Sequence, residues 1–299
     1  MPTGERSAAP RAADGHARDV LLGALSVALF SGFALASRTG LTAAFAPWDL
    51  AALRFGVGGL LLLPVLVRHG FANVAPRQAA ALALTGGVGF AACAYAGFAL
   101  APAAHGAVLL HGTLPLTTYL LARAIGCPVR RNAGLAVIAL GVAVIAADGA
   151  LGGTPEQWLG DGALLLASFS WSAYGLLARR LALRPEHTAS IVAVLSMAAA
   201  LAVFVAWPGL RFSPAGWREW LFQALFQGVL IGAVSTYVFT TAIARLGPQR
   251  MSALAAAVPC VTTLGAVVVL GESPSLLVLT GVALVTTGVL VSLRPAPSG

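Results

Sequence analysis

The sequence predicts an all-α integral membrane protein with ten transmembrane helices, arranged as two inverted five-helix repeats. Three observations carry this prediction: a very apolar composition, ten apolar segments of membrane-spanning length, and landmarks that recur in both halves. Of 299 residues, 59% are hydrophobic and only 9% are charged, and the mean hydropathy is +0.88. A soluble domain carries about a quarter charged residues, so this chain is suited to a lipid environment.

The ten predicted spans are bounded by charges, prolines and turn residues. Each is close to the roughly 17–25 apolar residues that a helix needs to cross the hydrocarbon. They are residues 20–38, 49–67, 78–100, 103–124, 132–148, 160–178, 188–207, 219–242, 249–270 and 275–293. Runs such as GLAVIALGVAVIAA do not alternate as barrel strands do. The short connections leave no room for a soluble domain, and residues 1–19 predict a disordered cytoplasmic tail.

The charge distribution predicts the orientation of these spans. All 18 basic residues are arginine, and they cluster between apolar segments rather than with aromatics as in a nucleic-acid surface. With a cytoplasmic N-terminus, fourteen arginines lie on the inner side and three on the outer side. The excess of inner arginines predicts a multi-pass protein of a bacterial-type inner membrane with both termini cytoplasmic. The lipid bilayer is thus an expected partner and nucleic acid is not.

An internal repeat relates the two halves. GALSVALFS at 23–31 and GALLLASFS at 162–170 share six of nine residues, 139 positions apart. Pro115 and Pro259 are 144 apart, and Gly134 and Gly141 precede Gly281 and Gly288 by 147. Chance similarity between Ala- and Leu-rich helices is the alternative for any single match, but three landmarks in order favour a repeat.

The repeat divides the chain into residues 20–150 and 151–295, with five predicted spans each. Because five is odd, the second repeat enters the membrane from the opposite side, an architecture that recurs in secondary transporters. The first span also resembles a secretory signal ending in ALAS at 34–37. The repeat favours its retention as part of the fold.

Several short motifs resemble the EamA-type members of the drug/metabolite transporter superfamily. They are LRF at 53–55, WSAY at 171–174 and a Gly-Glu loop, LGES, at 270–273. The corresponding first loop reads IGCP at 125–128, with Cys127 where the family commonly has glutamate. The resemblance implies a ten-helix fold with a central cavity lined mainly by helices one to four and six to nine, and with helices five and ten at the periphery. It also implies transport of small metabolites, often outward and often amino acids or related compounds.

Arg54 lies about 7.5 Å below the outer end of its predicted span at 1.5 Å per residue, whereas every other arginine lies at or outside a span end. One interpretation is that its long side chain snorkels to the outer interface. The other is a cavity-facing role, in which Arg54 anchors a substrate carboxylate or holds the outer gate closed through a carbonyl. The resemblance favours the second interpretation.

Other polar and aromatic residues within the spans are candidates for substrate binding or gating, because such groups usually face an interior cavity. With Arg54, the predicted set is Tyr95, His111, Pro115, Trp171, Tyr174, Gln227, Tyr237 and Pro259. Pro115 is expected to free the carbonyl of His111, four residues earlier. Trp171 and Tyr174 are i, i+3 neighbours that either form a cavity wall or serve as packing and interfacial anchors.

Proton coupling would rest on histidine, because no Asp or Glu lies deep in a predicted span. His105 and His111 are the candidates, since histidine changes charge near neutral pH. The alternative is an uncoupled facilitator.

The chain contains no lysine to complete a phosphate-binding loop, and no His/Cys cluster has metal-ligand spacing. We therefore expect no catalytic residues, no metal, no cofactor and no enzymatic activity. The predicted function is a secondary transporter of a small-molecule substrate, working as a homodimer or a monomer. A non-transporting receptor or assembly protein and an intramembrane enzyme are the alternatives.

Overall fold

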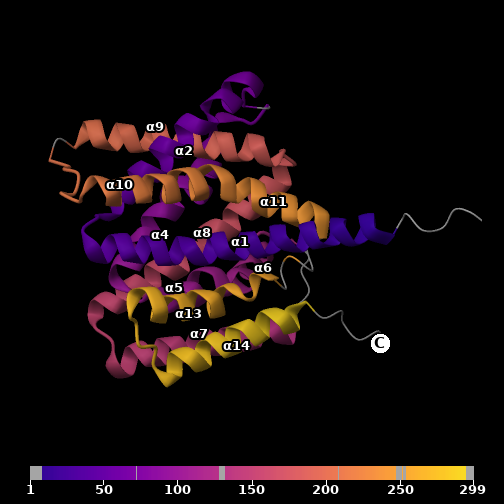
Figure 1. The fold of residues 1–299 in the computed structure, drawn as a ribbon, viewed down its shortest axis with the longest axis vertical. Helices are drawn as coiled ribbons and strands as arrows, with labels where there is room; N and C mark the ends of the chain where they lie inside the picture. Colours follow the sequence, from indigo (N-terminus) through magenta and orange to yellow (C-terminus); the bar gives the residue numbers. More distant parts are fainter. Residues whose placement is uncertain are drawn as a thin grey trace, which may run out of the picture.

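The structure is a computed structural model that describes residues 9–71, 73–127, 132–207, 209–246, 251 and 254–293. Every regular element in this described part is helical (Figure 1). The helices are α1 (Ala9–Ala43), α2 (Pro47–His69), α3 (Pro76–Ala83), α4 (Gly89–Leu100), α5 (Ala103–Gly106), α6 (Leu114–Ala124), α7 (Ala133–Gly152), α8 (Pro155–Leu181), α9 (Pro185–Ala206), α10 (Trp217–Gln223), α11 (Ser235–Leu246), α13 (Val258–Leu270) and α14 (Leu276–Ser292).

In the described part of the chain, three π-helical segments interrupt otherwise continuous helices. They are η1 (Leu84–Val88), η2 (Ala107–Gly112) and η3 (Ala224–Val234). They link α3 to α4, α5 to α6 and α10 to α11, so these pairs occupy the third, fourth and eighth predicted spans. π-Helical turns are rare and occur frequently at functional sites, and two of these three contribute residues to the cavity described below.

Among the described residues, five helical stretches are long and apolar enough to cross a membrane by length and composition. They are Arg18–Ala43, Pro47–His69, Pro76–Leu100, Ala133–Gly152 and Pro185–Ala206. Val258–Leu270 and Leu276–Ser292 are shorter apolar helices. Each of the ten predicted spans overlaps a helix in the described residues, although residues 256–257 of the ninth form a turn before α13. The count of ten crossings goes beyond what helix length and composition establish.

One boundary differs from the sequence prediction. α1 begins at Ala9, so residues 9–19, expected within a disordered tail, are helical. Pro10 falls in the first turn of α1, where proline is tolerated, and Gly15 weakens a helix without ending it. The helix therefore extends past the end of the apolar segment. Residues 1–8 lie outside the described part.

The other helix starts follow local rules. Proline occupies the first turn of α2, α3, α8 and α9, where its missing N–H costs nothing. Side-chain oxygens of Asn132, Thr154 and Ser275 cap α7, α8 and α14 by accepting the N–H three residues on. Such caps satisfy donors that helix ends leave unpaired.

Helix contacts occur in matched sets. The two most extensive contacts are α7 with α14 and α2 with α9, and Figure 1 shows α7 and α14 side by side along one edge of the bundle. α1 packs on α11 and α13, while α8 packs on α4 and α6. In span numbers, the first helix contacts the eighth and ninth, and the sixth contacts the third and fourth. Exchanging the two halves therefore maps these contacts onto one another.

The four repeated glycines form the α7–α14 contact. A Cβ on Gly134 would lie 2.3 Å from the carbonyl oxygen of Gly288, and one on Gly281 would lie 3.2 Å from that of Gly141. Because Gly134 corresponds to Gly281 and Gly141 to Gly288, the two contacts are equivalent under exchange of the halves. Small residues of this kind allow helix backbones to approach closely in lipid.

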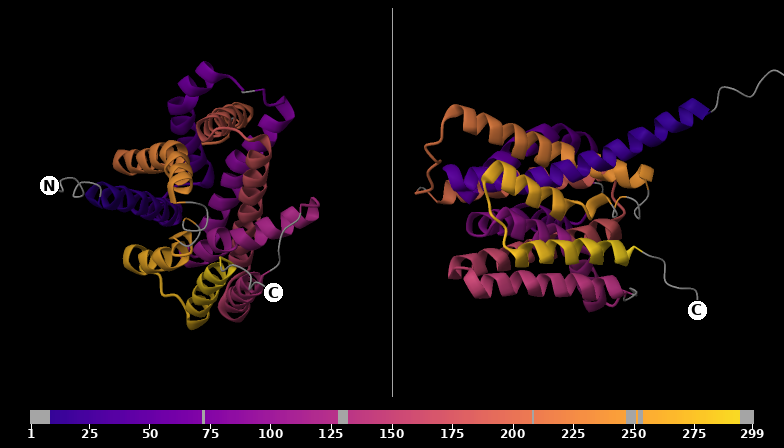
Figure 2. Two further views of the ribbon diagram at one scale, coloured as in Figure 1. Left: turned by 90° about the vertical axis from the view of Figure 1, so that its right-hand side faces the viewer. Right: turned by 60° about the horizontal axis from the view of Figure 1, so that its bottom comes forward.

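The start of α1 and the end of α14 lie at the same end of the bundle (Figure 2). We call this the termini end and the opposite one the far end. The turn between α8 and α9 also lies at the termini end in the predicted order of spans.

Candidate functional site

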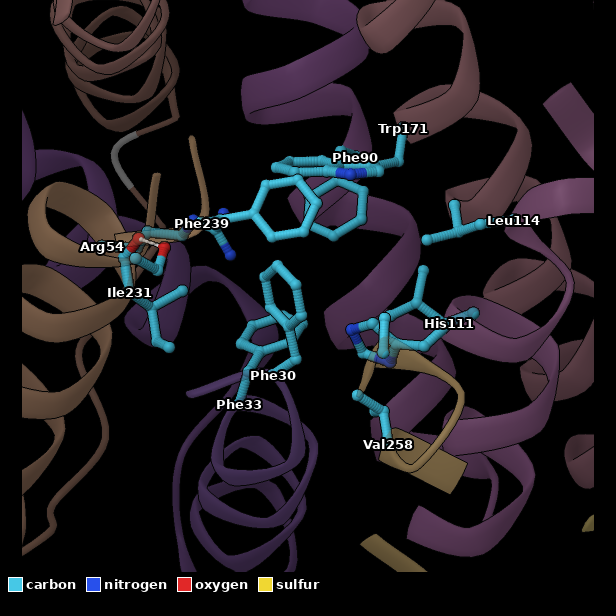
Figure 3. Close-up of a pocket in the computed structure, with 13 residues that line it drawn as sticks. Phe30, Phe33, Arg54, Phe90, His111, Leu114, Trp171, Ile231, Phe239 and Val258 are labelled. Carbon is cyan, nitrogen blue, oxygen red and sulfur yellow. Dashed lines mark hydrogen bonds between the residues drawn. The ribbon is translucent and has the colours of Figure 1, made fainter. Parts of the chain in front are cut away.

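A central cavity of about 80 Å³ lies between helices of both halves (Figure 3). Most of its lining is apolar or aromatic. The lining residues are Phe30, Phe33, Arg54, Phe90, Leu110, His111, Leu114, Trp171, Ile231, Ser235, Phe239, Ala255 and Val258. A cavity with mostly apolar walls and a few polar groups is typical of small-molecule sites.

Arg54 provides the permanent charge of this cavity. Its guanidinium carbon lies 5.2 Å from the Phe33 ring centroid and 5.3 Å from that of Phe90, and the residue is only 7% exposed. Aromatic faces attract the cation, but they accept no full hydrogen bond. Its Nη1 is buried without a hydrogen-bond partner among the described residues. The guanidinium is therefore buried rather than snorkelling to an interface, and retains a free donor.

A hydrogen-bonded chain lies behind Arg54. The Tyr95 hydroxyl donates to Gln227 Oε1 at 3.1 Å, and Gln227 Nε2 donates to Ser37 Oγ at 3.1 Å. Tyr95 and Gln227 are fully buried, and the tyrosine hydroxyl lies within electrostatic range of Arg54. This chain ties α4, η3 and α1 together and fixes the surroundings of the guanidinium. Tyr95 and Gln227 thus support the cavity wall without lining it.

His111 lies on the other side of the cavity from Arg54, with aromatic rings between them (Figure 3). Its ring stacks on Phe30 at 5.7 Å between centroids and meets Phe33 edge-on at 6.4 Å. Nδ1 is buried and has no partner among the described residues. The Thr113 N–H donates to the His111 carbonyl, so the expectation that Pro115 frees this carbonyl is wrong. The available polar group of His111 is its imidazole.

A wider vestibule of about 460 Å³ continues from the central cavity. The two share Phe30, Leu114, Trp171, Ser235 and Phe239. Trp171 and Tyr174 form one wall, with their rings 5.0 Å apart. The vestibule ends among exposed residues at the C-terminus of α8 and the start of α9, including Arg179 and Pro185. The cavity thus opens at the termini end.

The far end is closed by five charged or titratable residues, which we call the far-end cluster: Arg38, His105, Asp148, Asp161 and Glu272. Arg38 donates to the carbonyls of Phe98 and Ala99 at 2.8 and 3.0 Å and lies 3.6 Å from Glu272. Glu272 also accepts the N–H of Ala103 at 2.9 Å. These contacts join the end of α1 to α4, α5 and the loop after α13.

His105 is the centre of this cluster. Its Nδ1 lies 2.9 Å from Asp161 at the start of α8, and its Nε2 lies 3.5 Å from Asp148 near the end of α7. Asp148 in turn accepts the Ser275 hydroxyl. His105 is 1% exposed, and the 220 Å³ cavity beside it shares no lining residue with the central cavity. His105 therefore belongs to the closure of the far end, away from His111.

The structure brings together part of the residue set that the sequence predicts. Arg54, His111 and Trp171 line the central cavity, and Tyr174 lines the vestibule. Pro259 packs behind the cavity wall, where its ring would lie 3.5 Å from a Cβ on Gly112. Neither Pro259 nor Pro115 is among the lining residues of the central cavity. Tyr237 is 66% exposed. It lies two residues from both Ser235 and Phe239, so the helical period places it on the opposite face of α11.

Sequence reasoning missed the aromatic lining. Phe30, Phe33, Phe90 and Phe239 surround the space between Arg54 and His111. The i, i+3 spacing of Phe30 and Phe33 is a signal for one helix face, but phenylalanine in an apolar span equally suits lipid. The two carboxylates on His105 were also missed, because Asp148 and Asp161 each lie near a helix end in the sequence.

Among the described residues, no group of three His, Cys, Asp or Glu side chains could hold a metal ion. The three cysteines are free, and Cys127 is exposed. At the position of the first Gly-led loop the chain thus lacks the acid that Glu272 supplies in the second.

Comparison with known proteins agrees with this architecture. Residues 158–294 match the model of the EamA-like transporter family. No curated protein sequence matches the chain. One of thirteen matching chains of solved structure, a crystal structure, is 24% identical. It covers 94% of this chain and 99% of its own length at a TM-score of 0.63, which establishes similarity of fold. The second half of the chain, over residues 158–294, is therefore similar to the EamA-like transporter family.

Proposed function

We propose that this protein is a secondary transporter that moves a small organic metabolite across the membrane by alternating access. The observation that carries the proposal is a buried, incompletely satisfied guanidinium in a cavity that opens at one end and is closed at the other. Arg54 forms part of the cavity wall. The vestibule leads from the cavity to Arg179 at the termini end, and the far-end cluster lies at the opposite end. A site accessible from one side at a time is what such a mechanism requires.

An inverted repeat of ten spans is the architecture that we infer. Its support is the exchange symmetry of the helix contacts and of the glycine contacts between α7 and α14. The cavity lining adds to this support. His111 and Leu114 of the first half correspond, at the 144-residue offset, to Ala255 and Val258 of the second, and all four line the cavity. Two equivalent halves can exchange conformations and so expose one site to either side.

The proposed orientation places the termini end, and hence the open vestibule, in the cytoplasm of a bacterial-type inner membrane. Loading from the cytoplasm then favours export. The exposed thiol of Cys127 tests the orientation. A membrane-impermeant maleimide should label it in inside-out vesicles and leave it unlabelled in intact cells. Ser273→Cys in a Cys127→Ser background is the reciprocal control, and labelling of both sites from one side would contradict the topology.

Transport itself is tested with purified protein in liposomes. A thermal-shift screen of amino acids and other metabolites identifies ligands, and counterflow of each hit follows. We expect flux, which a receptor would not support, and recovery of the solute unchanged, which an enzyme would not give. Arg54→Lys should reduce flux by roughly tenfold or more, because lysine lacks the planar fork that binds an anion through two donors. Unchanged flux in this variant would exclude that recognition.

Coupling to protons is proposed to involve His105 and His111, as an exchanger; an uncoupled facilitator is the alternative. A protonated histidine donates from both ring nitrogens, so charge on His105 would hold both of its carboxylates. In the His105→Asn/His111→Asn double variant, counterflow at several pH values should lose its pH dependence. Retention of the wild-type profile would favour the facilitator.

A further inference from the structure

We propose that the substrate is an organic monocarboxylate with an apolar body and without a charged amine, bound with its carboxylate between Arg54 and His111. This inference rests on the proposed transport function and narrows its substrate class. Two buried nitrogen atoms on opposite sides of the central cavity, Arg54 Nη1 and His111 Nδ1, have no partner among the described residues. Buried polar groups are rarely left without a partner, so these two mark where a ligand supplies acceptors.

The charge balance of the cavity selects a single negative charge. Arg54 is the charged residue among the described lining of the central cavity, and its guanidinium is permanently protonated. The only other charged residue of the described vestibule lining is Arg179, at its exposed mouth. A monocarboxylate neutralises Arg54 and accepts from His111 when Nδ1 carries its proton, whereas a dianion would bury an excess charge.

The same inventory disfavours a zwitterionic amino acid. No Asp or Glu occurs among the described residues that line the central cavity or the vestibule. Aromatic faces could attract an ammonium, but those of Phe33 and Phe90 already face the Arg54 guanidinium. An ammonium next to the bound carboxylate would be desolvated near a like charge and would lack an acceptor.

The shape of the cavity indicates the direction in which the apolar body of the substrate extends. The central cavity, at about 80 Å³, is far smaller than the vestibule of about 460 Å³. Small-molecule sites usually measure about 300–1,000 Å³. The narrow part therefore fits the carboxylate, and the body extends past Trp171 and Tyr174 into the vestibule between α6, α8 and α11.

Calorimetric binding to the purified full-length protein tests this inference with four probes of one shape. They are 3-phenylpropanoate, its amide, phenylalanine and 2-phenylethylamine, supplemented by short-chain and branched monocarboxylates. 3-Phenylpropanoate should bind at least about tenfold more tightly than its amide, because the amide loses the hydrogen-bonded charge pair with Arg54. It should bind more tightly than phenylalanine by a similar factor, because phenylalanine buries an unpaired ammonium. Equal binding of phenylalanine, or absence of binding throughout the carboxylate series, would overturn the inference.

Two variants and a control assign the effect to the site. Arg54→Gln should abolish the preference for carboxylate over amide, and His111→Ala should weaken carboxylate binding while leaving that preference. Arg77→Gln, an exposed arginine at the start of α3, should change neither. If Arg54→Gln fails to fold, the His111 variant and the probe series still decide. Carboxylate binding without counterflow in liposomes would overturn the transport proposal alone, whereas counterflow of phenylalanine at equal efficiency would overturn this inference alone.

Discussion

At the scale of single residues, Arg54 illustrates how a charge is accommodated inside a span. Placing arginine at the centre of a membrane helix costs about 2.5–3.5 kcal/mol. Three ring faces lie within 6 Å of its guanidinium, those of Phe33, Phe55 and Phe90, and desolvated cation–π contacts are each worth about 2 kcal/mol. The aromatic residues therefore hold the cation in place without consuming its hydrogen-bond donors.

The Tyr95 hydroxyl yields a prediction at this scale. Tyr95→Phe removes the donor to Gln227 Oε1 in a fully buried setting. An acceptor left unsatisfied costs about 1–3 kcal/mol, so the thermal unfolding midpoint of the purified protein should fall. Tyr119→Phe is the matched control, since no hydrogen bond of the Tyr119 hydroxyl is recorded in the described structure. Equal midpoints for the two variants would contradict the supporting role of Tyr95.

At the scale of elements, close contact between α7 and α14 depends on glycine. In Gly288→Ala the new Cβ would lie 2.8 Å from the Gly134 carbonyl oxygen and from Ile138. Forcing apart a packed backbone costs about 1–3 kcal/mol, so this variant should unfold at lower temperature. Gly162→Ala on α8 is the control, because its Cβ meets nothing within 4 Å and alanine favours helix by up to about 1 kcal/mol. The thermal unfolding midpoint of Gly162→Ala should therefore stay unchanged or rise.

The same scale shows what the sequence could predict. Helix positions could be predicted from the length of the apolar segments and from prolines such as Pro47 and Pro155, which lie in the first turns of α2 and α8. These signals are local in the sequence. Which side of a helix meets the cavity depends on neighbours far away in the chain. Tyr95 and Tyr237 look alike in sequence, yet Tyr95 is fully buried against Gln227 and Tyr237 is exposed. Likewise, no local pattern links His105 to Asp148 and Asp161, because three separate helices supply them.

At the scale of the whole molecule, the proposed alternating access predicts that the far-end cluster holds its end of the cavity closed. Asp161→Asn removes one charged partner of the buried His105. Loss of a hydrogen bond to a charged group costs about 1.5–3 kcal/mol, which shifts a two-state equilibrium by roughly ten- to hundredfold. The population with an open far end should therefore increase.

Spin labels at Gln157 and Ser273, which both line the far-end cavity, measure this shift as a longer distance distribution in a cysteine-free background. Glu156→Gln, which changes an exposed carboxylate five residues before Asp161 on α8, is the control and should leave the distribution unchanged. If Asp161→Asn also leaves it unchanged, the cluster does not hold the far end closed.

The glycine contacts between α7 and α14 have a consequence for motion. In the proposed alternating access the two repeats exchange conformations, and most helix pairs must then separate on one side and approach on the other. The contact of Gly134 with Gly288 instead becomes that of Gly281 with Gly141, which already exists in the same pair. The proposed exchange would thus leave this pair unchanged, and we expect it to act as a fulcrum that stays fixed while the helices around the cavity rock about it.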